Sequence, residues 1–362
     1  MNMVKSRSMV RTCAECFNHT CRLTCTAVRA VLHVAGPPCV DWSPQWAKRL
    51  RELGPNFLAT IAWLAQRLVI LEPVVVHENV IGFDVGILIA ALDGHYAVFT
   101  ASMCFSALGW PVKRLRRITI CIRKDLLQSV TYPWDRYLSD CQRLCKSSWL
   151  EFARASQSDI DAFLEWARGR PTSMHQMTDK QIRKAIKAEC KEWGGQWKVV
   201  LAAAQESIFT MSLLASECRR LVDYRNMARS SSPHGCEYLV CLLGQEPHTH
   251  PQFSTEPVMN TIIKSASIVW ADKLGRPLTG YERICAQGFV AFPDFSFNGV
   301  LSSSFLTNSD ERKRSDLCTQ AGNSMPVPLI GAAVLWSTLA VRRTEPIVLN
   351  SSLSKLMTLQ RR

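Results

Sequence analysis

The sequence lacks long apolar runs, although 47% of its 362 residues are hydrophobic. A membrane-spanning helix needs roughly 18–20 consecutive apolar residues, and the apolar runs here are far shorter. The N-terminal segment, residues 1–8, is basic but has no apolar block of the kind that a secretory signal requires. The sequence therefore indicates neither a membrane span nor secretion.

Glycine is also absent from the first 35 residues of the chain. A glycine-rich turn allows the backbone to approach a nucleotide-like ligand closely, since glycine has no Cβ atom. The segment that precedes Gly36 cannot supply such a turn. This absence excludes a glycine-lined nucleotide cradle from that part of the chain.

A disulfide framework is not indicated either. The 15 cysteines are an odd number and are scattered through a long apolar chain, which is typical of a protein from a reducing compartment. Structural zinc sites usually separate two ligand pairs by a dozen or more residues. Neither cluster of cysteine and histidine residues has that spacing: Cys13, Cys16, His19, Cys21 and Cys25 in the first, and His234, Cys236, Cys241, His248 and His250 in the second. We therefore expect no metal site, and we expect residues 1–29 to form a poorly ordered tail.

Acidic residues are few relative to basic ones. The chain contains 43 Lys and Arg against 30 Asp and Glu, which gives a formal charge of +13. Basic proteins bind polyanions through phosphate contacts and the release of counterions. Charge alone leaves two interpretations open, a nucleic-acid-binding protein and a protein with a generally basic surface.

One stretch organises the rest of the chain. The apolar run Val31–Ala35 predicts a short buried strand, and Gly36, Pro37 and Pro38 turn the chain out of it and place Cys39 at the exit. A second apolar strand, Pro73–Val80, ends in the carboxylate of Glu78. Residues at the ends of adjacent strands reach a shared ligand crevice in open α/β sheets. A thiol and a carboxylic acid at the same end make a nucleophile and a proton donor, which suggests covalent chemistry.

These segments resemble the motifs of the DNA cytosine-5 methyltransferases. They resemble, in order, the family's Pro-Cys nucleophile motif, its Glu-Asn-Val motif, its Gln-x-Arg-x-Arg motif, the segment after its target-recognition region, and its Gly-Asn-Ser motif. The corresponding residues stand in family order: Gly36–Cys39, Glu78–Val80, Gly109–Arg117, Leu278–Phe289 and Gly322–Met325. Val112 replaces the family's glutamine.

The resemblance implies a role for each catalytic candidate. Cys39 would add as a thiolate to carbon 6 of a cytosine that has been flipped out of double-stranded DNA. Glu78 would hold or protonate ring nitrogen 3, and Asn79 would orient its loop. Arg116, together with Arg114, would position the base or Glu78.

The resemblance also implies S-adenosyl-L-methionine as methyl donor, and only Pro38, Asn323 and Ser324 match the family's cofactor contacts. The family's Phe-x-Gly-x-Gly turn is not found, which a reading frame cut short at its 5′ end would explain. Two alternatives to a DNA methyltransferase remain open: a catalytically inactive DNA-binding remnant, and an RNA cytosine-5 methyltransferase. The implied location is the nucleus in a eukaryote and the cytoplasm otherwise.

The expected fold is α/β, a Rossmann-like methyltransferase sheet, truncated at its N-terminus, with a smaller inserted target-recognition domain. The expected domains are the tail 1–29, a catalytic core 30–130, the recognition region 131–256, a return to the core 257–342, and a disordered tail 343–362. Apolar spacing predicts helices over 57–71, 83–92 and 329–339, strands over 96–101 and 117–123, and a hairpin at one sheet edge. A basic amphipathic helix is expected over 180–197, which fits either a solvated face or a phosphate-contacting surface of the recognition region.

Overall fold

The computed structural model describes residues 30–43, 50–263, 268–289 and 321–343. The chain divides into two compact units, of which the first comprises residues 1–100, 119–132 and 337–362, and the second comprises residues 101–118 and 133–336. The expected N-terminal tail, residues 1–29, and the chain beyond residue 343 lie outside the described residues. The two units are described separately below.

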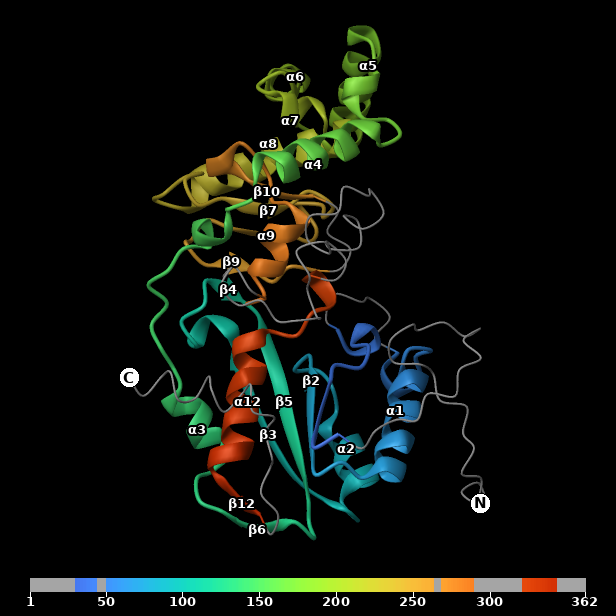
Figure 1. Ribbon diagram of the computed structural model, residues 1–362. Helices are drawn as coiled ribbons and strands as arrows, with labels where there is room; N and C mark the ends of the chain where they lie inside the picture. Colours follow the sequence, from blue (N-terminus) through green and yellow to red (C-terminus); the bar gives the residue numbers. More distant parts are fainter. Residues whose placement is uncertain (1–29, 44–49, 264–267, 290–320, 344–362) are drawn as a thin grey trace. The chain divides into compact units, whose positions relative to one another are not determined.

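The main sheet contains four strands in the order β1-β2-β5-β3 (Figure 1). Their bounds are β1 Leu32–Ala35, β2 Val74–Asn79, β3 Tyr96–Cys104 and β5 Leu115–Arg123. β1 and β2 are parallel. Main-chain bonds from Lys124 to His95 and from Phe105 to Arg114 join β5 and β3 near opposite ends, which is an antiparallel pattern. The expected α/β fold is confirmed, and its sheet has the expected hairpin at one edge.

Two helices, α1 (Phe57–Ile70) and α2 (Val85–Leu92), pack on one face of this sheet (Figure 1). They share a core cluster with the sheet that includes Leu64 of α1, Leu88 of α2 and Val75 of β2. α2 begins at a capping residue, Asp84, whose carboxylate accepts a hydrogen bond from the Gly86 amide at 2.8 Å. Both helices fall where the apolar spacing predicted them.

The orientation of α1 differs from the expectation. A helix of this apolar content ordinarily packs its large apolar side chains on the sheet, but Leu58, Ile61 and Leu68 are 71%, 46% and 37% exposed. The buried face instead carries Leu64 together with the polar Thr60 and Arg67. Arg67 turns inward because the loop between α1 and β2 places a partner there: it forms an ion pair with the buried Glu72.

Two further strands of the first unit pair antiparallel: β6 (Leu127–Val130) and β12 (Val341–Arg343). The Thr131 amide and hydroxyl both donate to the Ala340 carbonyl, at 2.8 and 2.9 Å. These bonds join segments that are separated by more than two hundred residues. The C-terminal end of the described chain therefore returns to the first unit.

The second unit is mainly helical, with a small sheet. Its helices are α3 Trp134–Asp140, α4 Gln157–Gly169, α5 Asp179–Trp193, α6 Trp197–Ala204, α7 Ile208–Met211, α8 Ala215–Ser231 and α9 Gly280–Cys285. Its sheet has the order β11-β10-β7-β8, with the bounds Arg276–Pro277, Val269–Ala271, Val240–Leu242 and Phe253–Ser254. β4 (Val112–Lys113) pairs in parallel with β9 (Met259–Asn260).

The basic helix is shorter than expected. It ends at Trp193 because Gly194 and Gly195 adopt left-handed backbone conformations, with φ of +87° and +96°, and a new helix begins at Trp197. The closing helix, α12 (Val327–Leu339), begins two residues earlier than the predicted 329–339. No helix in the described parts of the chain is both long and apolar enough to span a membrane.

Candidate active site

The turn after β1 carries Cys39. The strand ends at Ala35, and the chain passes through Gly36 and two prolines into a short 3₁₀ turn that begins at Val40. The Trp42 amide donates to the Cys39 carbonyl at 3.0 Å, which holds the backbone of the cysteine in place. The Cys39 side chain is half-buried. A thiol in this position is held by its backbone and remains partly accessible to a reactant.

Glu78 and Asn79 form the end of β2. Both are buried, with 6% and 1% of their surfaces exposed. Asn79 holds two segments at once, because its side-chain oxygen accepts from the Val80 amide at 2.8 Å and its side-chain amide donates to the Pro37 carbonyl at 3.4 Å. The second bond links the end of β2 directly to the cysteine-bearing turn. Asn79 therefore ties the carboxylate segment to the thiol segment.

The register of the two strands places these groups at one edge of the sheet. Val34 pairs with Val76, and Ala35 pairs with His77, in a parallel ladder. The carboxyl ends of parallel neighbours meet at the same edge, so the Pro38–Cys39 segment and Glu78 leave the sheet together. The structure thus brings four of the expected site residues to one place in the first unit: Pro38, Cys39, Glu78 and Asn79.

Asp41 was not singled out from the sequence. It is 2% exposed, and its two carboxylate oxygens accept hydrogen bonds from the main-chain amide and the side-chain amide of Asn56, at 3.1 and 3.2 Å. Gly54 lies so close that a Cβ atom there would fall 2.1 Å from the carboxylate carbon. Asp41 therefore anchors the entrance to α1 against the turn that carries Cys39. The sequence signal that could have identified Asp41 is its position, two residues after Cys39.

The loop after β2 also packs on the cysteine-bearing turn. A Cβ atom at Gly82 would lie 2.7 Å from the Trp42 carbonyl oxygen, so only glycine permits this approach. The Trp42 ring contacts the rings of Phe83 and Phe57, with centroids 5.2 and 6.2 Å apart. These contacts, together with Asn79, hold the loops after β1 and β2 as one rigid element.

Two histidines lie between α1 and the parallel strand pair. The Trp63 indole donates to His33 Nε2 at 3.0 Å, and the Trp63 ring packs on His77 with centroids 5.4 Å apart. Burial, assisted by Arg67, lowers the pKa of His33 to about 4, and burial lowers the pKa of His77 to about 3. Both ring nitrogens of His77 lack a hydrogen-bond partner within the described segments. Both histidines are therefore neutral at physiological pH.

Arg114 belongs to the second unit and makes structural contacts. It is 2% exposed, and its guanidinium donates to the carbonyls of Ile262 at 3.3 Å, Gly322 at 3.3 Å and Ser324 at 2.7 Å. These bonds hold the Gly322–Ser324 turn against the loop after β9. The sequence pattern indicated a functional arginine but not these partners. Arg116 is half-buried, and its guanidinium donates to the Leu115 carbonyl at 2.8 Å.

The Gly-Asn-Ser turn supplies the other cofactor candidates. The Ser324 hydroxyl donates to the Ala321 carbonyl at 2.9 Å, whereas the Asn323 side chain is exposed. Arg114 fixes the backbone of this turn, so an exposed amide is presented from a rigid position. Asn323 therefore fits a hydrogen-bonding contact to a polar cofactor, and Ser324 supports the turn.

One helix of the second unit, α5, presents a basic face. Its cations follow helical spacing along α5, and all are exposed: Lys180, Arg183, Lys184, Lys187 and Lys191. No carboxylate in the described residues pairs with any of them. The Lys187 ammonium lies 4.4 Å from the centroid of the Trp197 ring. An unneutralised row of this kind is suited to contacts with phosphates.

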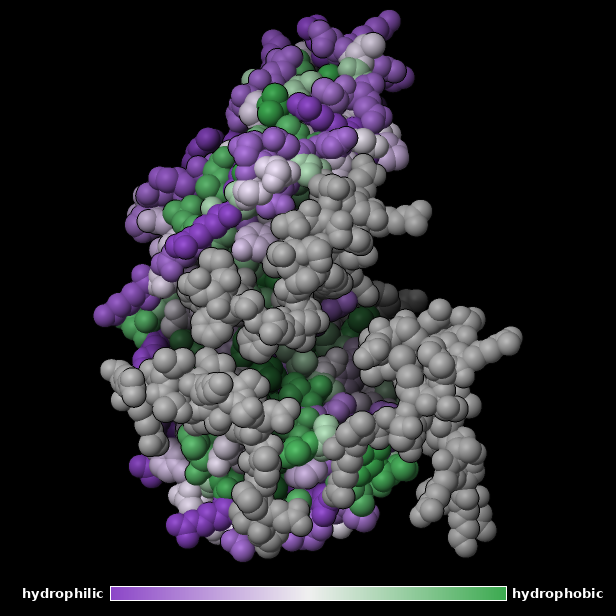
Figure 2. Space-filling view, viewed as in Figure 1, coloured by the Kyte–Doolittle hydropathy of each residue, from purple (hydrophilic) through white to green (hydrophobic). Residues whose placement is uncertain are grey.

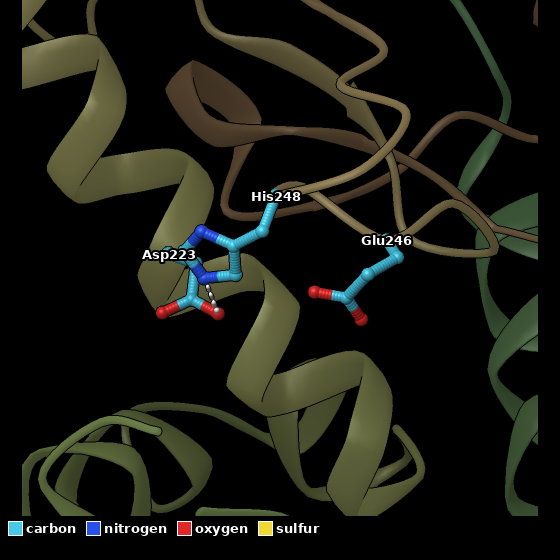
Figure 3. A group of neighbouring side chains, drawn as sticks. All are labelled: Asp223, Glu246 and His248. Carbon is cyan, nitrogen blue, oxygen red and sulfur yellow. Dashed lines mark ion pairs between the residues drawn. The ribbon is translucent and has the colours of Figure 1, made fainter. Parts of the chain in front are cut away.

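Asp223, Glu246 and His248 form a group whose potential ligand atoms lie within 4.8 Å of one another (Figure 3). His248 Nε2 lies 3.5 Å from Asp223, but the cations of Arg219 and Arg220 already engage the carboxylates. Burial raises the pKa of Asp223. Burial acts in the same direction on Glu246, but the hydrogen bonds and charge of Arg219 outweigh it, so the pKa of Glu246 is lowered. We interpret the group as an ion-pair network that fastens the loop after β7 to α8.

Comparison with solved structures finds methyltransferases among the similar chains. No protein-family model matches the sequence, and no curated protein matches it. The S. pombe Dnmt2 methyltransferase is 12% identical with a TM-score of 0.41, over 85% of this chain and 78% of that chain. A putative DNA modification methyltransferase encoded within an E. coli prophage gives the same values. The Entamoeba histolytica methyltransferase EhMeth is 11% identical with a TM-score of 0.39, over 84% and 76% of the two chains.

Proposed function

We propose that the protein methylates carbon 5 of cytosine in DNA, with S-adenosyl-L-methionine as methyl donor and Cys39 as covalent nucleophile. The observation that carries the proposal is the parallel pairing of β1 and β2, reinforced by the hydrogen bond from Asn79 to Pro37. This arrangement delivers a thiol and a buried carboxylic acid to one edge of the sheet. The ordered motifs of the sequence supply the reaction class.

The chemistry assigned to the chain's own residues is an addition followed by an elimination. The Cys39 thiolate forms a bond to carbon 6, and the electron pair of the 5,6 double bond moves toward carbon 5 while Glu78 donates a hydrogen bond or a proton to nitrogen 3. After carbon 5 has been methylated and has lost its proton to a base, the carbon–sulfur bond breaks and Cys39 leaves as thiolate. The rigid pairing of the two loops keeps thiol and acid aligned through both steps.

The cofactor supplies an electrophilic methyl group when it is bound. Within this chain we assign Asn323 to a polar contact with it, Ser324 to support of that turn, and Pro38 to packing. Arg114 then acts as a positioning residue, because it bonds to the carbonyls on both sides of Asn323.

Double-stranded DNA is the proposed partner, and α5 is the proposed phosphate-binding element. Phosphate contacts fix the register of a protein on the duplex without reading its sequence. The exposed cations of α5, which lack acidic partners within the described residues, suit that role. The target cytosine must leave the base stack to reach the half-buried Cys39.

A covalent trap tests the proposal. The protein is incubated with duplex DNA that contains 5-fluorocytosine, with and without S-adenosyl-L-methionine, and denaturation-resistant adducts are measured by mass spectrometry. The fluorine at carbon 5 cannot leave as a proton does, so the adduct accumulates after methyl transfer. We expect an adduct that requires the cofactor and maps to Cys39.

The matched controls are Cys39→Ser, which must abolish the adduct, and Cys104→Ser, which replaces another half-buried thiol and must retain it. DNA that remains bound without forming an adduct would identify a DNA-binding remnant instead. An adduct that forms on 5-fluorocytosine RNA and not on DNA would assign the protein to RNA modification.

A further inference from the structure

The outward surface of α1 is apolar and uncharged. Leu58, Ile61, Leu68 and Val69 are 71%, 46%, 37% and 54% exposed, and the other exposed positions of the helix are alanines and one glutamine. The single charged residue of α1, Arg67, is buried. Surface helices ordinarily show the opposite pattern, and a helix that is apolar all round is normally covered on all sides. The outward face of α1 therefore has the composition of an interface.

The neighbouring helix extends this surface. The sequence of α2, VGILIAAL, contains no charged residue, and Ile89 on its outer side is 45% exposed. Ile81, in the loop that leads to α2, is 43% exposed. Figure 2 shows hydrophobic side chains at the surface near the lower end of α1 as labelled in Figure 1. Exposed apolar side chains gathered on neighbouring elements in this way are typical of a binding face.

The chemistry of the face favours a protein as its occupant. A helix that lies on a membrane surface combines its apolar face with Lys or Arg on the polar face, and α1 exposes no cation at all. The chain as a whole carries a net charge of +13, so two copies repel one another over most of their surfaces. The uncharged α1 face is a place where two copies can meet without opposing like charges.

The spacing of the apolar residues is self-complementary. Leu58, Ile61, Ala65 and Leu68 follow the alternating three- and four-residue steps of a helix-pairing seam. Leu58 and Leu68 lie equally far on either side of Trp63, and so do Ile61 and Ala65. When two such helices are antiparallel, each Leu58 faces the partner's Leu68 and each Ile61 faces the partner's Ala65, a large residue against a small one.

We propose that the protein forms a twofold homodimer in which α1 pairs antiparallel with α1 of a second copy, about an axis near Trp63. The interface is isologous, so one surface satisfies both partners. The helix is 14 residues long, or about 20 Å, and one helix pair falls short of the roughly 1,200 Å² of a stable interface. The dimer is therefore expected to dissociate in the micromolar range, on the order of 10 µM. The proposal does not depend on the catalytic function.

Sedimentation velocity over roughly 1–100 µM tests the geometry with three variants. Ile61→Lys and Ala65→Glu each place an unpaired charge in the seam and are expected to raise the dissociation constant at least tenfold. A mixture of the two variants regains a dimer, because Lys at 61 faces Glu at 65 of the partner only in the antiparallel arrangement. Ala59→Lys, on an exposed position outside the seam, is the control and leaves association unchanged.

Circular dichroism first establishes that each variant is folded. A mass that stays monomeric over the whole concentration range overturns the proposal, and so does a wild-type dimer that Ile61→Lys leaves intact. Neither variant may regain the dimer when it is measured alone, so that recovery requires both variants in the mixture. A monomer that binds anionic phospholipid vesicles through this face, and loses binding in Ile61→Lys, would assign the surface to a membrane instead.

Discussion

The side-chain amide of Asn79 donates to the Pro37 carbonyl at 3.4 Å, and the Asn79 oxygen accepts from the Val80 amide at 2.8 Å. One buried side chain thus joins the segment that carries Glu78 to the turn that carries Cys39. The link depends on an amide, because a carboxylate can accept the second bond but cannot donate the first.

Asn79→Asp therefore removes the hydrogen bond to the Pro37 carbonyl and keeps the one from the Val80 amide. We expect the variant to lose about 1 kcal/mol or more of folding free energy, since the Pro37 carbonyl loses its donor and faces a buried charge. If the proposed function holds, the rate of Cys39 adduct formation falls by more than the folded fraction does. Urea unfolding measures the first effect, and the 5-fluorocytosine trap measures the second. Unchanged stability would show that the bond to Pro37 contributes nothing.

Gly54→Ala tests the packing against Asp41. A Cβ atom at this position would lie 2.1 Å from the Asp41 carboxylate carbon, so either the carboxylate or the Gly54 backbone must move. We expect a loss of about 2 kcal/mol, measured by urea unfolding. The matched control is Gly94→Ala, where a Cβ atom meets nothing within 4 Å. Equal stability of the two variants would contradict the tight contact.

The buried histidines predict a loss of stability in mild acid. Both pKa values are lowered from an ordinary value of 6.5, to about 4 for His33 and to about 3 for His77. The unfolded chain binds protons below about pH 6.5, whereas the folded chain does not until the pH approaches 4. Unfolding therefore becomes easier as the pH falls through this window, by roughly 1.5 kcal/mol for the buried His77 between pH 6.5 and 5, and by less for the partly exposed His33, which solvent screens.

Urea unfolding at about pH 7 and about pH 5 measures how the free energy of unfolding changes with pH. The two values lie above and below the ordinary histidine pKa. His77→Leu removes the more deeply buried of the two histidines and is expected to flatten the slope. His95→Leu, at an exposed position, serves as the control and should leave it unchanged. A His77→Leu slope equal to that of the wild type would show that His77 does not titrate across this window.

Arg114→Lys tests the clamp on the Gly322–Ser324 turn. A lysine cannot bridge the carbonyls of Ile262, Gly322 and Ser324 together, so at least one buried carbonyl loses its donor. We expect a destabilisation of about 2 kcal/mol and faster hydrogen exchange at the amides of residues 322–325. Lys113→Ala, at the exposed neighbouring position, should change neither quantity. Unaltered exchange in Arg114→Lys would show that Arg114 does not hold this turn.

The basic face of α5 makes a prediction about salt dependence. Replacing Lys180, Lys184 or Lys191 by alanine should weaken binding to duplex DNA of any sequence. The slope of log K against log salt should fall by about one for each phosphate that the variant no longer neutralises. Lys273→Ala is the matched control, because Lys273 is already paired with Glu237 at 3.4 Å. Fluorescence anisotropy at several salt concentrations measures the slope, and slopes equal to that of the control would place the phosphate-binding surface elsewhere.

Several elements of the fold could be predicted from local pattern. The strand before Gly36, the strand that ends at Asn79 and the two helices of the first unit lie where the apolar spacing placed them. The predicted basic helix was too long, because a pair of glycines with positive φ ends the helix at Trp193. Glycine pairs permit many conformations, so spacing alone could not locate this end.

The sequence by itself determined the order of strands, turns and helices and the positions of Cys39 and Glu78 at strand ends, because proline, glycine and apolar periodicity act over a few residues. Only the tertiary structure decided which face of α1 points outward, what Arg114 holds, and that Asp41 anchors the turn at Cys39. These features depend on groups that meet only when the chain folds: Leu64 of α1 packs with Val75 of β2, the Asn56 amide reaches Asp41, and the carbonyls of Gly322 and Ser324 reach Arg114 across about two hundred residues. Local preference cannot specify such partners, because the free energy that selects them exists only once the core has closed.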